Sequence, residues 1–323
     1  MKNVAAITLV FALFLVGAPK LWQTAFEAGA LPVSAPTYNF PATFRLLHTE
    51  TGAVSELTAV DYLVGCLYAE ISPDYELEAL KAQAVAAHTY ALRLIRNHEL
   101  YPSTKPEGAD LTDAPADSQA YFTEEQARDY YGSDYDKYYA NIRTAAEYGA
   151  KRMILHEGKP IYAVYTAATS GMTNTADSLW NKSLPYLRSV GSAFDEGFPN
   201  FEATKEISVE QMRAALLNYD RGINMPVDYY LWFSQQKKNA AGYTESIQAG
   251  DTVLSGGDLW RIFELRSADF DVAFDGTAFV FVTRGLGHGA GLSQYGANVL
   301  ANRGKTAEDI LGYYYSGVEI ANG

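Results

Sequence analysis

The sequence predicts an α+β protein, and three observations support this class. Residues 56–71 and 76–98 carry apolar side chains at helical spacing. Shorter runs such as "ATFRLLH" (42–48) and "AFVFVTRGL" (278–286) are typical of strands. The two kinds of segment alternate without a regular βαβ rhythm, which favours mixed helices and antiparallel strands.

The elements are expected in the following order. A strand at 42–48 precedes the two helices; in the second helix the apolar positions are Leu77, Leu80, Ala84, Ala87, Ala91 and Leu94. Residues 102–120, rich in Pro, Asp and Ser, predict a surface loop, and residues 151–167 predict a hairpin turning at 157–159. Residues 191–256 resemble an irregular insertion with short helices. A buried strand at 278–286 and helices at 291–302 and 306–315 complete the chain.

The N-terminal segment predicts a link to a membrane. Residues 4–18 form an almost continuous apolar stretch, which is short beside the roughly 17–25 residues of a spanning helix and also fits a signal-peptide core. Pro19 makes a poor cleavage context, which favours an uncleaved, single-pass anchor over a secreted form. We therefore expect an anchor or signal segment at 1–25, a linker at 26–39 and an extracytoplasmic catalytic domain at 40–323.

Composition excludes several classes of function. The net charge of −13 argues against a nucleic-acid partner, because phosphates would be repelled. The 24 tyrosines and 4 tryptophans suit carbohydrate binding as well as core packing. The single cysteine, Cys66, lies in an apolar helical pattern, where a buried core role is expected. With one cysteine and no clustered histidines, no metal or other cofactor is expected.

Two segments carry most of the functional information. In "LYAEISPDYELEALKAQAVAAHTYAL" (67–92), Glu70 follows an apolar run and precedes a Ser-Pro break. In "GLGHGAGLSQYGANVLANRGKTAEDILGYYYSGVEI" (285–320), glycines flank His288 and permit close backbone approach. Each has a structural alternative: Glu70 as a first-turn carboxylate favoured by the next helix's dipole, and His288 as a buried imidazole bonded to backbone. A phosphate-binding loop is poorly supported, because Gly-Lys-Ser/Thr does not follow the glycines.

Four stretches together resemble the stage II sporulation protein D family, which includes amidase enhancers. They are "EALKAQAVAAHTYAL", "LRSADF" (265–270), "GLGHGAGLSQYGA" and "DILGYYYSG", spread over residues 40–320. The resemblance implies a lytic transglycosylase that cleaves peptidoglycan glycan strands during engulfment in sporulation. It also implies a preference for strands whose stem peptides an amidase has removed, so peptidoglycan and a cell-wall amidase are the expected partners. The family's catalytic acid falls on Glu70.

The chemistry fits one carboxyl group. Glycosidases usually need two carboxylates, but a transglycosylase takes its attacking hydroxyl from the substrate. Its acid must be protonated near neutral pH, so its pKa must be raised, and apolar neighbours do this by desolvation. Leu67, Tyr68 and Ala69 give Glu70 such surroundings.

Further residues are expected to bind the glycan. The fold is predicted to bring the glycine-rich loop to face Glu70 across one cleft, with side chains that orient or stack on sugars. These candidates are Lys81, His88, Tyr165, Ser170, Thr173, His288, Ser293, Gln294 and Tyr295.

Two positions depart from the family pattern. His88 stands where many members have arginine, and its charge depends on pH. Thr169–Thr173 replaces a glycine of the usual Ser-Gly-Gly-x-Thr stretch with Ser170. A non-catalytic protein that binds peptidoglycan and enhances an amidase is therefore the alternative function. A hydrolase using Ser170 with His288 lacks the Gly-x-Ser-x-Gly context.

Overall fold

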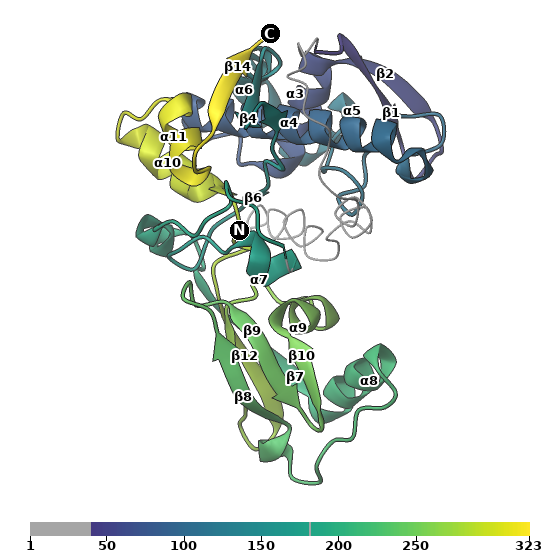
Figure 1. Ribbon diagram of the computed structural model, residues 1–323, viewed down its shortest axis with the longest axis vertical. Helices are drawn as coiled ribbons and strands as arrows, with labels where there is room; N and C mark the ends of the chain where they lie inside the picture. The colour runs from purple at the N-terminus through teal and green to yellow at the C-terminus, as the bar shows by residue number, and fades with distance from the viewer. Residues whose placement is uncertain (1–39, 181) are drawn as a thin grey trace. The chain divides into compact units, whose positions relative to one another are not determined.

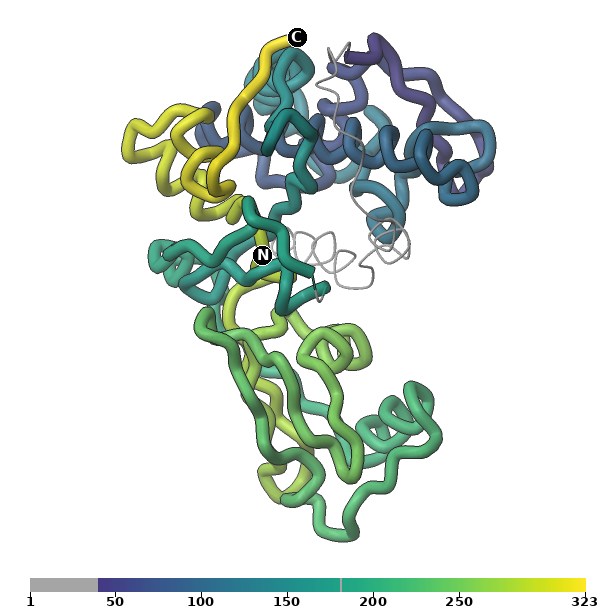
Figure 2. The backbone as a smooth tube through the Cα atoms, viewed as in Figure 1, coloured from purple at the N-terminus to yellow at the C-terminus, as the bar shows by residue number. Residues whose placement is uncertain are grey.

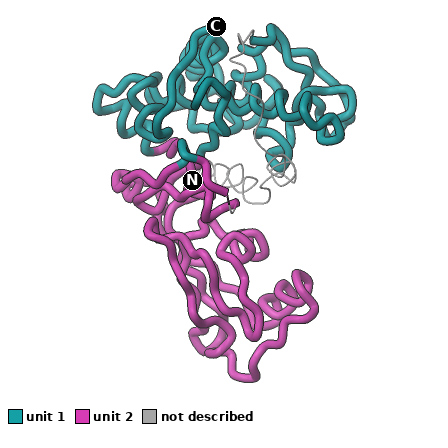
Figure 3. Tube along the Cα trace, viewed as in Figure 1, with its two compact units in different colours: residues 1–165, 185–187, 296–323 teal, residues 166–184, 188–295 magenta. Residues whose placement is uncertain are grey.

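The computed structural model describes residues 40–180 and 182–323. They form two compact units, coloured separately in Figure 3. Unit 1 comprises residues 40–165, 185–187 and 296–323, and unit 2 comprises residues 166–184 and 188–295. The mixed class of helices and antiparallel sheets predicted from the sequence is confirmed.

The centre of unit 1 is helical (Figure 1). Helix α4 (Leu77–Leu100) packs most closely on α6 (Tyr135–Gly149), where a Cβ on Gly149 would come within 2.6 Å of the Ala84 Cβ. Glycine at this position therefore permits the close approach. The remaining helices are α3 (Ala59–Glu70), α5 (Glu124–Tyr131), α10 (Gln294–Asn302), which starts at the end of unit 2, and α11 (Ala307–Tyr314).

Two small sheets flank these helices. In the first, β1 (Thr43–Leu47) pairs antiparallel with β2 (Val54–Thr58) and parallel with the short β3 (Leu111–Thr112). In the second, β4 (Arg152–His156) lies between β5 (Lys159–Pro160) and the C-terminal β14 (Glu319–Asn322), both antiparallel to it. The backbone trace in Figure 2 shows this meeting of distant segments. Glu157 and Gly158 turn the hairpin with positive φ.

Unit 2 contains two three-stranded antiparallel sheets. One has the order β11 (Phe270–Phe274), β12 (Ala278–Arg284), β7 (Glu202–Ser208); the other has β10 (Thr252–Ser255), β9 (Thr244–Ala249), β8 (Phe233–Lys238). An aromatic core joins them: Trp232 stacks on Phe279 at 5.1 Å, and Phe233 of β8 contacts Phe281 of β12. Short elements complete the unit: β13 (Leu292–Ser293), α7 (Ala176–Trp180), α8 (Val209–Tyr219) and α9 (Gly256–Ile262). Strand β6 (Tyr165–Thr166) spans the boundary, with Tyr165 in unit 1 and Thr166 in unit 2. Four 3₁₀ turns occur in the two units, at Pro102–Thr104, Gly132–Asp134, Ala193–Gly197 and Tyr229–Leu231.

Most predicted elements are present, but one interpretation was wrong. Residues 191–256 are not irregular, because they supply β7–β10 as well as α8. These strands were not predicted because β7 and β8 expose most of their side chains, so their sequences are mainly polar. The loop at 102–120 is only partly a surface loop, because Ala109, Leu111 and Gln119 are buried. Strand β12 alternates between buried and half-buried residues along its length.

No helix within residues 40–180 and 182–323 combines the length and the apolar character that crossing a bilayer requires. The apolar stretch at 4–18, and with it the predicted membrane anchor or signal segment, lies outside the described residues.

Candidate active site

Glu70 is the last residue of α3. The side chain of Thr58 caps the start of the helix by accepting the Asp61 N–H, and the helix ends where Ile71 turns extended. Glu70 therefore lies at a helix C-terminus and precedes α4 by several residues, so the first-turn alternative does not describe it. The negative end of the α3 dipole disfavours a charged carboxylate here. The side chain is buried, with 2% of its surface exposed.

Hydrogen bonds hold the Glu70 carboxyl group from another part of unit 1. The backbone N–H of Ala120 donates to Oε1 at 2.6 Å, and the Tyr165 side chain is a second hydrogen-bonding neighbour. Burial raises the pKa of Glu70 well above its ordinary value, and it outweighs the lowering effect of the Ala120 hydrogen bond. The raised pKa extends the pH range over which Glu70 keeps the proton that a general acid needs.

Gln119 completes this network. Its Nε2 donates to the Ala87 carbonyl at 3.2 Å and to the Tyr62 hydroxyl at 3.0 Å. Its Oε1 accepts the Tyr165 hydroxyl at 2.8 Å. Tyr165, predicted as a substrate contact, thus lies beside Glu70. The sequence analysis missed Gln119, because it sits in a stretch that reads as a polar loop and nothing in its sequence neighbours marks it.

The titratable groups around Glu70 are neutral near pH 7. Burial is the largest cause that raises the pKa of Tyr62, of Cys66 and of Tyr165. Cys66 is fully buried in α3, as its apolar pattern predicted. These neighbours favour an uncharged Glu70, because none of them supplies a compensating positive charge.

His88 lies in the core of unit 1. Its side chain is fully buried against Phe40 and Phe44, and its Nδ1 donates to the Arg152 carbonyl at 2.8 Å. Burial lowers its pKa to about 4, so it is neutral at pH 7. It therefore does not supply the permanent charge of an arginine. This geometry favours a packing role, and its predicted contact with the glycan stays a prediction.

Lys81 is engaged within unit 1. Its Nζ lies 2.6 Å from Glu78 Oε1, and the other oxygen of Glu78 accepts the Ala307 N–H at the start of α11. The ammonium also lies 5.2 Å from the centre of the Tyr148 ring. Its predicted role in substrate binding is untested.

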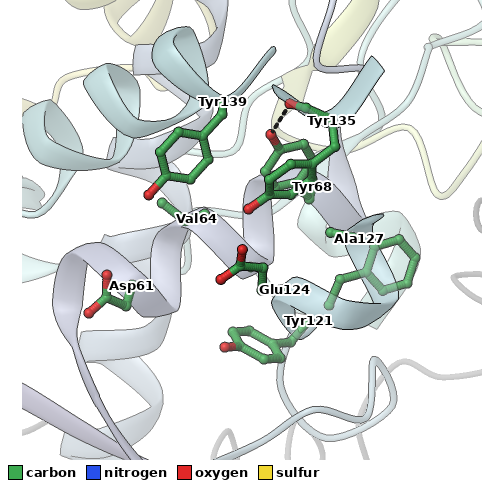
Figure 4. Close-up of a pocket in the computed structure, with 10 residues that line it drawn as sticks. Asp61, Val64, Tyr68, Tyr121, Glu124, Ala127, Tyr135 and Tyr139 are labelled. Carbon is green, nitrogen blue, oxygen red and sulfur yellow. Dashed lines mark hydrogen bonds between the residues drawn. The ribbon is translucent and has the colours of Figure 1, made fainter. Parts of the chain in front are cut away.

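A pocket of about 160 Å³ opens elsewhere in unit 1 (Figure 4). Tyr68 and Tyr135 stack at 4.8 Å on one wall, and the Tyr68 hydroxyl donates to the Tyr135 carbonyl. The carboxylates at its rim are paired, Asp61 with Arg143 and Glu124 with Arg128. Ligand pockets usually enclose about 300–1,000 Å³, and Glu70 does not line this one, so we do not assign the active site to it.

In unit 2 the glycine-rich loop is bound to the protein's own backbone. Gly285, Gly287, Gly289 and Gly291 all have positive φ, a conformation that glycine adopts without strain. Leu286 and Ala168 exchange backbone hydrogen bonds of 2.9 and 3.1 Å. A Cβ on Gly285 would come within 2.8 Å of the Ala168 carbonyl. Gly285 and Gly287 therefore permit a close approach to residues 166–169, and Gly289 permits one to the Tyr243 ring.

His288 is half-buried on this loop. Its Nδ1 accepts the Ala290 N–H at 3.0 Å, which places the proton of a neutral ring on Nε2. Trp180 meets the ring edge-on at 5.8 Å, and its indole was not anticipated from the sequence. A half-buried tryptophan beside a histidine is a surface on which a sugar ring can stack.

The other predicted contacts in unit 2 make internal bonds. The Ser170 N–H donates to the Tyr243 hydroxyl at 3.2 Å, Thr173 exchanges bonds with Val190, and the Tyr295 hydroxyl donates to Gly197. Ser293 and Gln294 are buried. Glu70 belongs to unit 1 and these residues to unit 2, and their meeting in one cleft stays a prediction.

Asp195 is a buried carboxyl group that the sequence did not reveal. Its Oδ2 accepts bonds from the Thr169 N–H (2.8 Å), the Thr169 hydroxyl (2.6 Å) and the Ser192 hydroxyl (3.0 Å). Burial nevertheless raises its pKa. It fixes the Thr169–Ser170 segment, because it binds both donors of Thr169.

Within the described ranges, no group of three or more His, Cys, Asp or Glu side chains is placed to hold a metal ion. The arrangement around Glu70 provides one buried carboxyl group whose pKa is raised by burial.

Fold and site thus define a mixed α/β protein whose candidate catalytic group is a single carboxylic acid. The family model described as "Stage II sporulation protein" matches residues 48–156. Stage II sporulation protein D of Bacillus subtilis (strain 168) is 31% identical over 297 residues, covering 90% of this chain and 80% of that protein. Its counterpart in Bacillus amyloliquefaciens is 31% identical over 290 residues, covering 90% and 79%.

The chain therefore belongs to the stage II sporulation protein D family. It is also similar to the amidase enhancer of Bacillus subtilis (strain 168), at 24% identity over 315 residues. That match covers 80% of this chain and 40% of the amidase enhancer.

Proposed function

We propose that this protein is a lytic transglycosylase that cleaves peptide-stripped peptidoglycan strands during cell-wall remodelling in sporulation. The observation that carries the proposal is Glu70: a buried carboxyl group with uncharged titratable neighbours, held by one backbone N–H. Membership of the family supports the substrate class.

The proposed reaction uses Glu70 twice. The protonated carboxyl group gives its proton to the oxygen that bridges two sugars, and the bond from the muramic acid C1 to that oxygen breaks. The resulting carboxylate then takes the proton of the C6 hydroxyl on the same sugar. The bond from O6 to C1 forms a 1,6-anhydro ring, so Glu70 regains its proton and no water is consumed.

Product masses test this proposal. Purified protein is incubated with peptide-stripped glycan strands, and the released fragments are analysed by mass spectrometry. Fragments ending in anhydromuramic acid, lighter by one water than reducing ends, are expected from the wild type. Reducing ends would indicate a hydrolase and would overturn the proposal. Since no metal takes part in the proposed steps, EDTA should leave the yield unchanged.

A second candidate is a non-catalytic protein that binds peptidoglycan and enhances an amidase. The similarity of this chain to an amidase enhancer favours this candidate. The neutral His88 in place of arginine favours it as well. It predicts no fragment from stripped strands, but faster release of stem peptides when the protein is added to a cell-wall amidase and intact peptidoglycan. Under either function we propose that residues 40–323 act outside the cytoplasm, attached to the membrane through the N-terminal segment.

A further inference from the structure

A chain of hydrogen bonds runs from α4 to Tyr165, a neighbour of the Glu70 carboxyl group, and its direction can be read from the groups themselves. It starts at the Ala87 carbonyl, which can only accept a hydrogen bond. The Gln119 amide group 3.2 Å away must therefore turn its Nε2 towards this oxygen. The second bond from Nε2, to the Tyr62 hydroxyl at 3.0 Å, agrees with that orientation.

The next bond follows from the first. With Nε2 facing Ala87, the Gln119 group that faces the Tyr165 hydroxyl is Oε1, at 2.8 Å. An amide oxygen only accepts, so the hydroxyl must donate. A tyrosine hydroxyl has a single proton, and this bond uses it.

Tyr165 therefore presents a lone pair of its oxygen to the Glu70 carboxyl group. A lone pair attracts the O–H of a carboxylic acid and repels a carboxylate. If the hydroxyl donated to Glu70 instead, it would lower the pKa of the acid. Gln119 decides between these two arrangements, because it binds the proton that Tyr165 would otherwise offer to Glu70.

We propose that Gln119 and Tyr165 are positioning residues: Gln119, acting through Tyr165, keeps Glu70 protonated and directs its proton. This inference rests on the proposed function only in giving that proton a use in catalysis. Both side chains are buried, and the Ala120 N–H that binds Glu70 adjoins Gln119 in the chain.

The other titratable groups near Glu70 do not supply this preference through charge. The pKa values of Tyr62 and Cys66 on α3 and of Tyr165 on β6 are raised, so all three groups are neutral. Tyr90 on α4 is among the groups that raise the pKa of Tyr165. The Ala120 N–H acts in the opposite direction, because it stabilises the carboxylate. What a substitution can remove is therefore the direction of the Gln119–Tyr165 hydrogen bond, in which Tyr165 donates, and with it the preference for a protonated Glu70.

The test measures the Glu70 carboxyl group directly. The full chain is labelled with ¹³C at the glutamate carboxyl carbons and titrated by NMR, and the spectrum of Glu70→Gln assigns the signal. Gln119→Met keeps the side-chain length but removes the acceptor, so the Tyr165 hydroxyl can turn and donate to Glu70. We expect the Glu70 pKa to fall by about one unit, the effect of one added hydrogen bond to a carboxylate.

A double variant shows whether Gln119 acts through Tyr165. In a Tyr165→Phe background no hydroxyl remains to turn, so Gln119→Met should no longer move the Glu70 pKa. Thr89→Val is the matched control. It removes a buried hydroxyl that bonds Val85 and Ile154 in unit 1, so it costs stability but should leave the Glu70 titration in place.

An unchanged Glu70 pKa in Gln119→Met overturns the inference, and so does an equal shift in the Tyr165→Phe background. If Gln119→Met does not fold, Tyr165→Phe alone decides by sign: loss of an acceptor lowers the Glu70 pKa, whereas loss of a donor raises it. The titration needs no turnover, so a wild type that forms no anhydro product would sink the proposed function and leave this result standing. In an active enzyme, Gln119→Met should move the alkaline limb of the pH–rate profile down by the same amount.

Discussion

The backbone N–H of Ala120 donates a 2.6 Å hydrogen bond to Oε1 of Glu70, from fifty residues further along the chain. A neutral carboxyl group accepts this bond through its carbonyl oxygen. The amide oxygen of a glutamine would accept it equally well. Glutamine at this position therefore reproduces the shape and the bonds of the protonated acid, but it has no acidic proton to give.

Replacing Glu70 with glutamine should remove catalysis and preserve the fold. Loss of a general acid costs about 100-fold or more in rate, and anhydro products from stripped strands should fall by at least that factor. The circular dichroism spectrum should not change.

Glu147→Gln provides the matched control for this substitution. Glu147 is an exposed carboxylate on α6, paired with Arg143, and its replacement should leave the yield of products unaltered. Near-normal turnover in Glu70→Gln would show that another group supplies the proton.

Glu70 should also lower the stability of the wild type as the pH rises. Its pKa in the folded protein is raised above its ordinary value of 4.5, so the stability linked to its protonated form is complete below pH 4.5. Above that pH the unfolded chain loses this proton while the folded chain retains it, and the free energy of unfolding declines up to the folded pKa. Glu70→Gln does not titrate, so this pH-dependent loss of stability is absent from the variant. In urea unfolding from pH 4.5 upwards, the variant should gain stability relative to the wild type; parallel curves would contradict the raised pKa.

His88 should give the opposite dependence. Its pKa is lowered from 6.5 to about 4 by burial, so its contribution is complete above pH 6.5. Between pH 6.5 and 4 the unfolded chain binds a proton that the folded chain does not, and about 3 kcal/mol of stability is lost. His88→Gln can still donate to the Arg152 carbonyl but does not titrate. The stability gap between wild type and variant should narrow by about that amount from pH 7 to pH 4, and a constant gap would refute the assignment.

The sequence predicts those parts of the fold that depend on local pattern. Helices α3 and α4 follow from apolar spacing within each segment, and the burial of Glu70 follows from Leu67, Tyr68 and Ala69 beside it. The hairpin of β4 and β5 follows from the turn at Glu157 and Gly158. Each of these features is encoded by near neighbours in the chain.

Features that depend on distant partners were not predicted. Gln119 meets Tyr62, Ala87 and Tyr165 from three separate elements, and no local pattern marks a residue with such partners. Strands β7 and β8 were missed because their exposed faces make them read as polar. The approach of a glycan to the glycines of 285–291 stays a prediction, and only the structure shows that residues 166–169 occupy the space beside Gly285 and Gly287.

His288 should matter more for glycan cleavage than for stability. The ring is half-buried beside Trp180, so truncation leaves only a small cavity in the core. We expect His288→Ala to reduce the rate of anhydro product release while the melting temperature changes little. His156→Ala, at the end of β4 in unit 1, is the control. If His288→Ala loses stability and activity in proportion, the imidazole is structural.

Gly65 lets the segment that carries Gln119 and Ala120 reach Glu70. A Cβ on Gly65 would come within 2.6 Å of the Phe122 carbonyl oxygen and would also strike the Tyr121 ring. The Phe122 N–H donates to the Gly65 carbonyl at 3.2 Å, so α3 and residues 119–122 touch at this point. Gly65→Ala should displace the segment and destabilise the protein by about 1–3 kcal/mol, as overpacking does.

Gly312 is the matched control for that substitution, because it also lies inside a helix, α11, and a Cβ there would meet nothing within 4 Å. Alanine at a helix-interior glycine ordinarily stabilises by about 0.5–1 kcal/mol. Thermal melts should therefore move in opposite directions for the two variants. Only Gly65→Ala should also lower the Glu70 pKa and the yield of anhydro products, because a displaced Gln119 no longer holds the Tyr165 proton. If Gly65→Ala is as stable and active as Gly312→Ala, the contact between α3 and residues 119–122 does not position the acid.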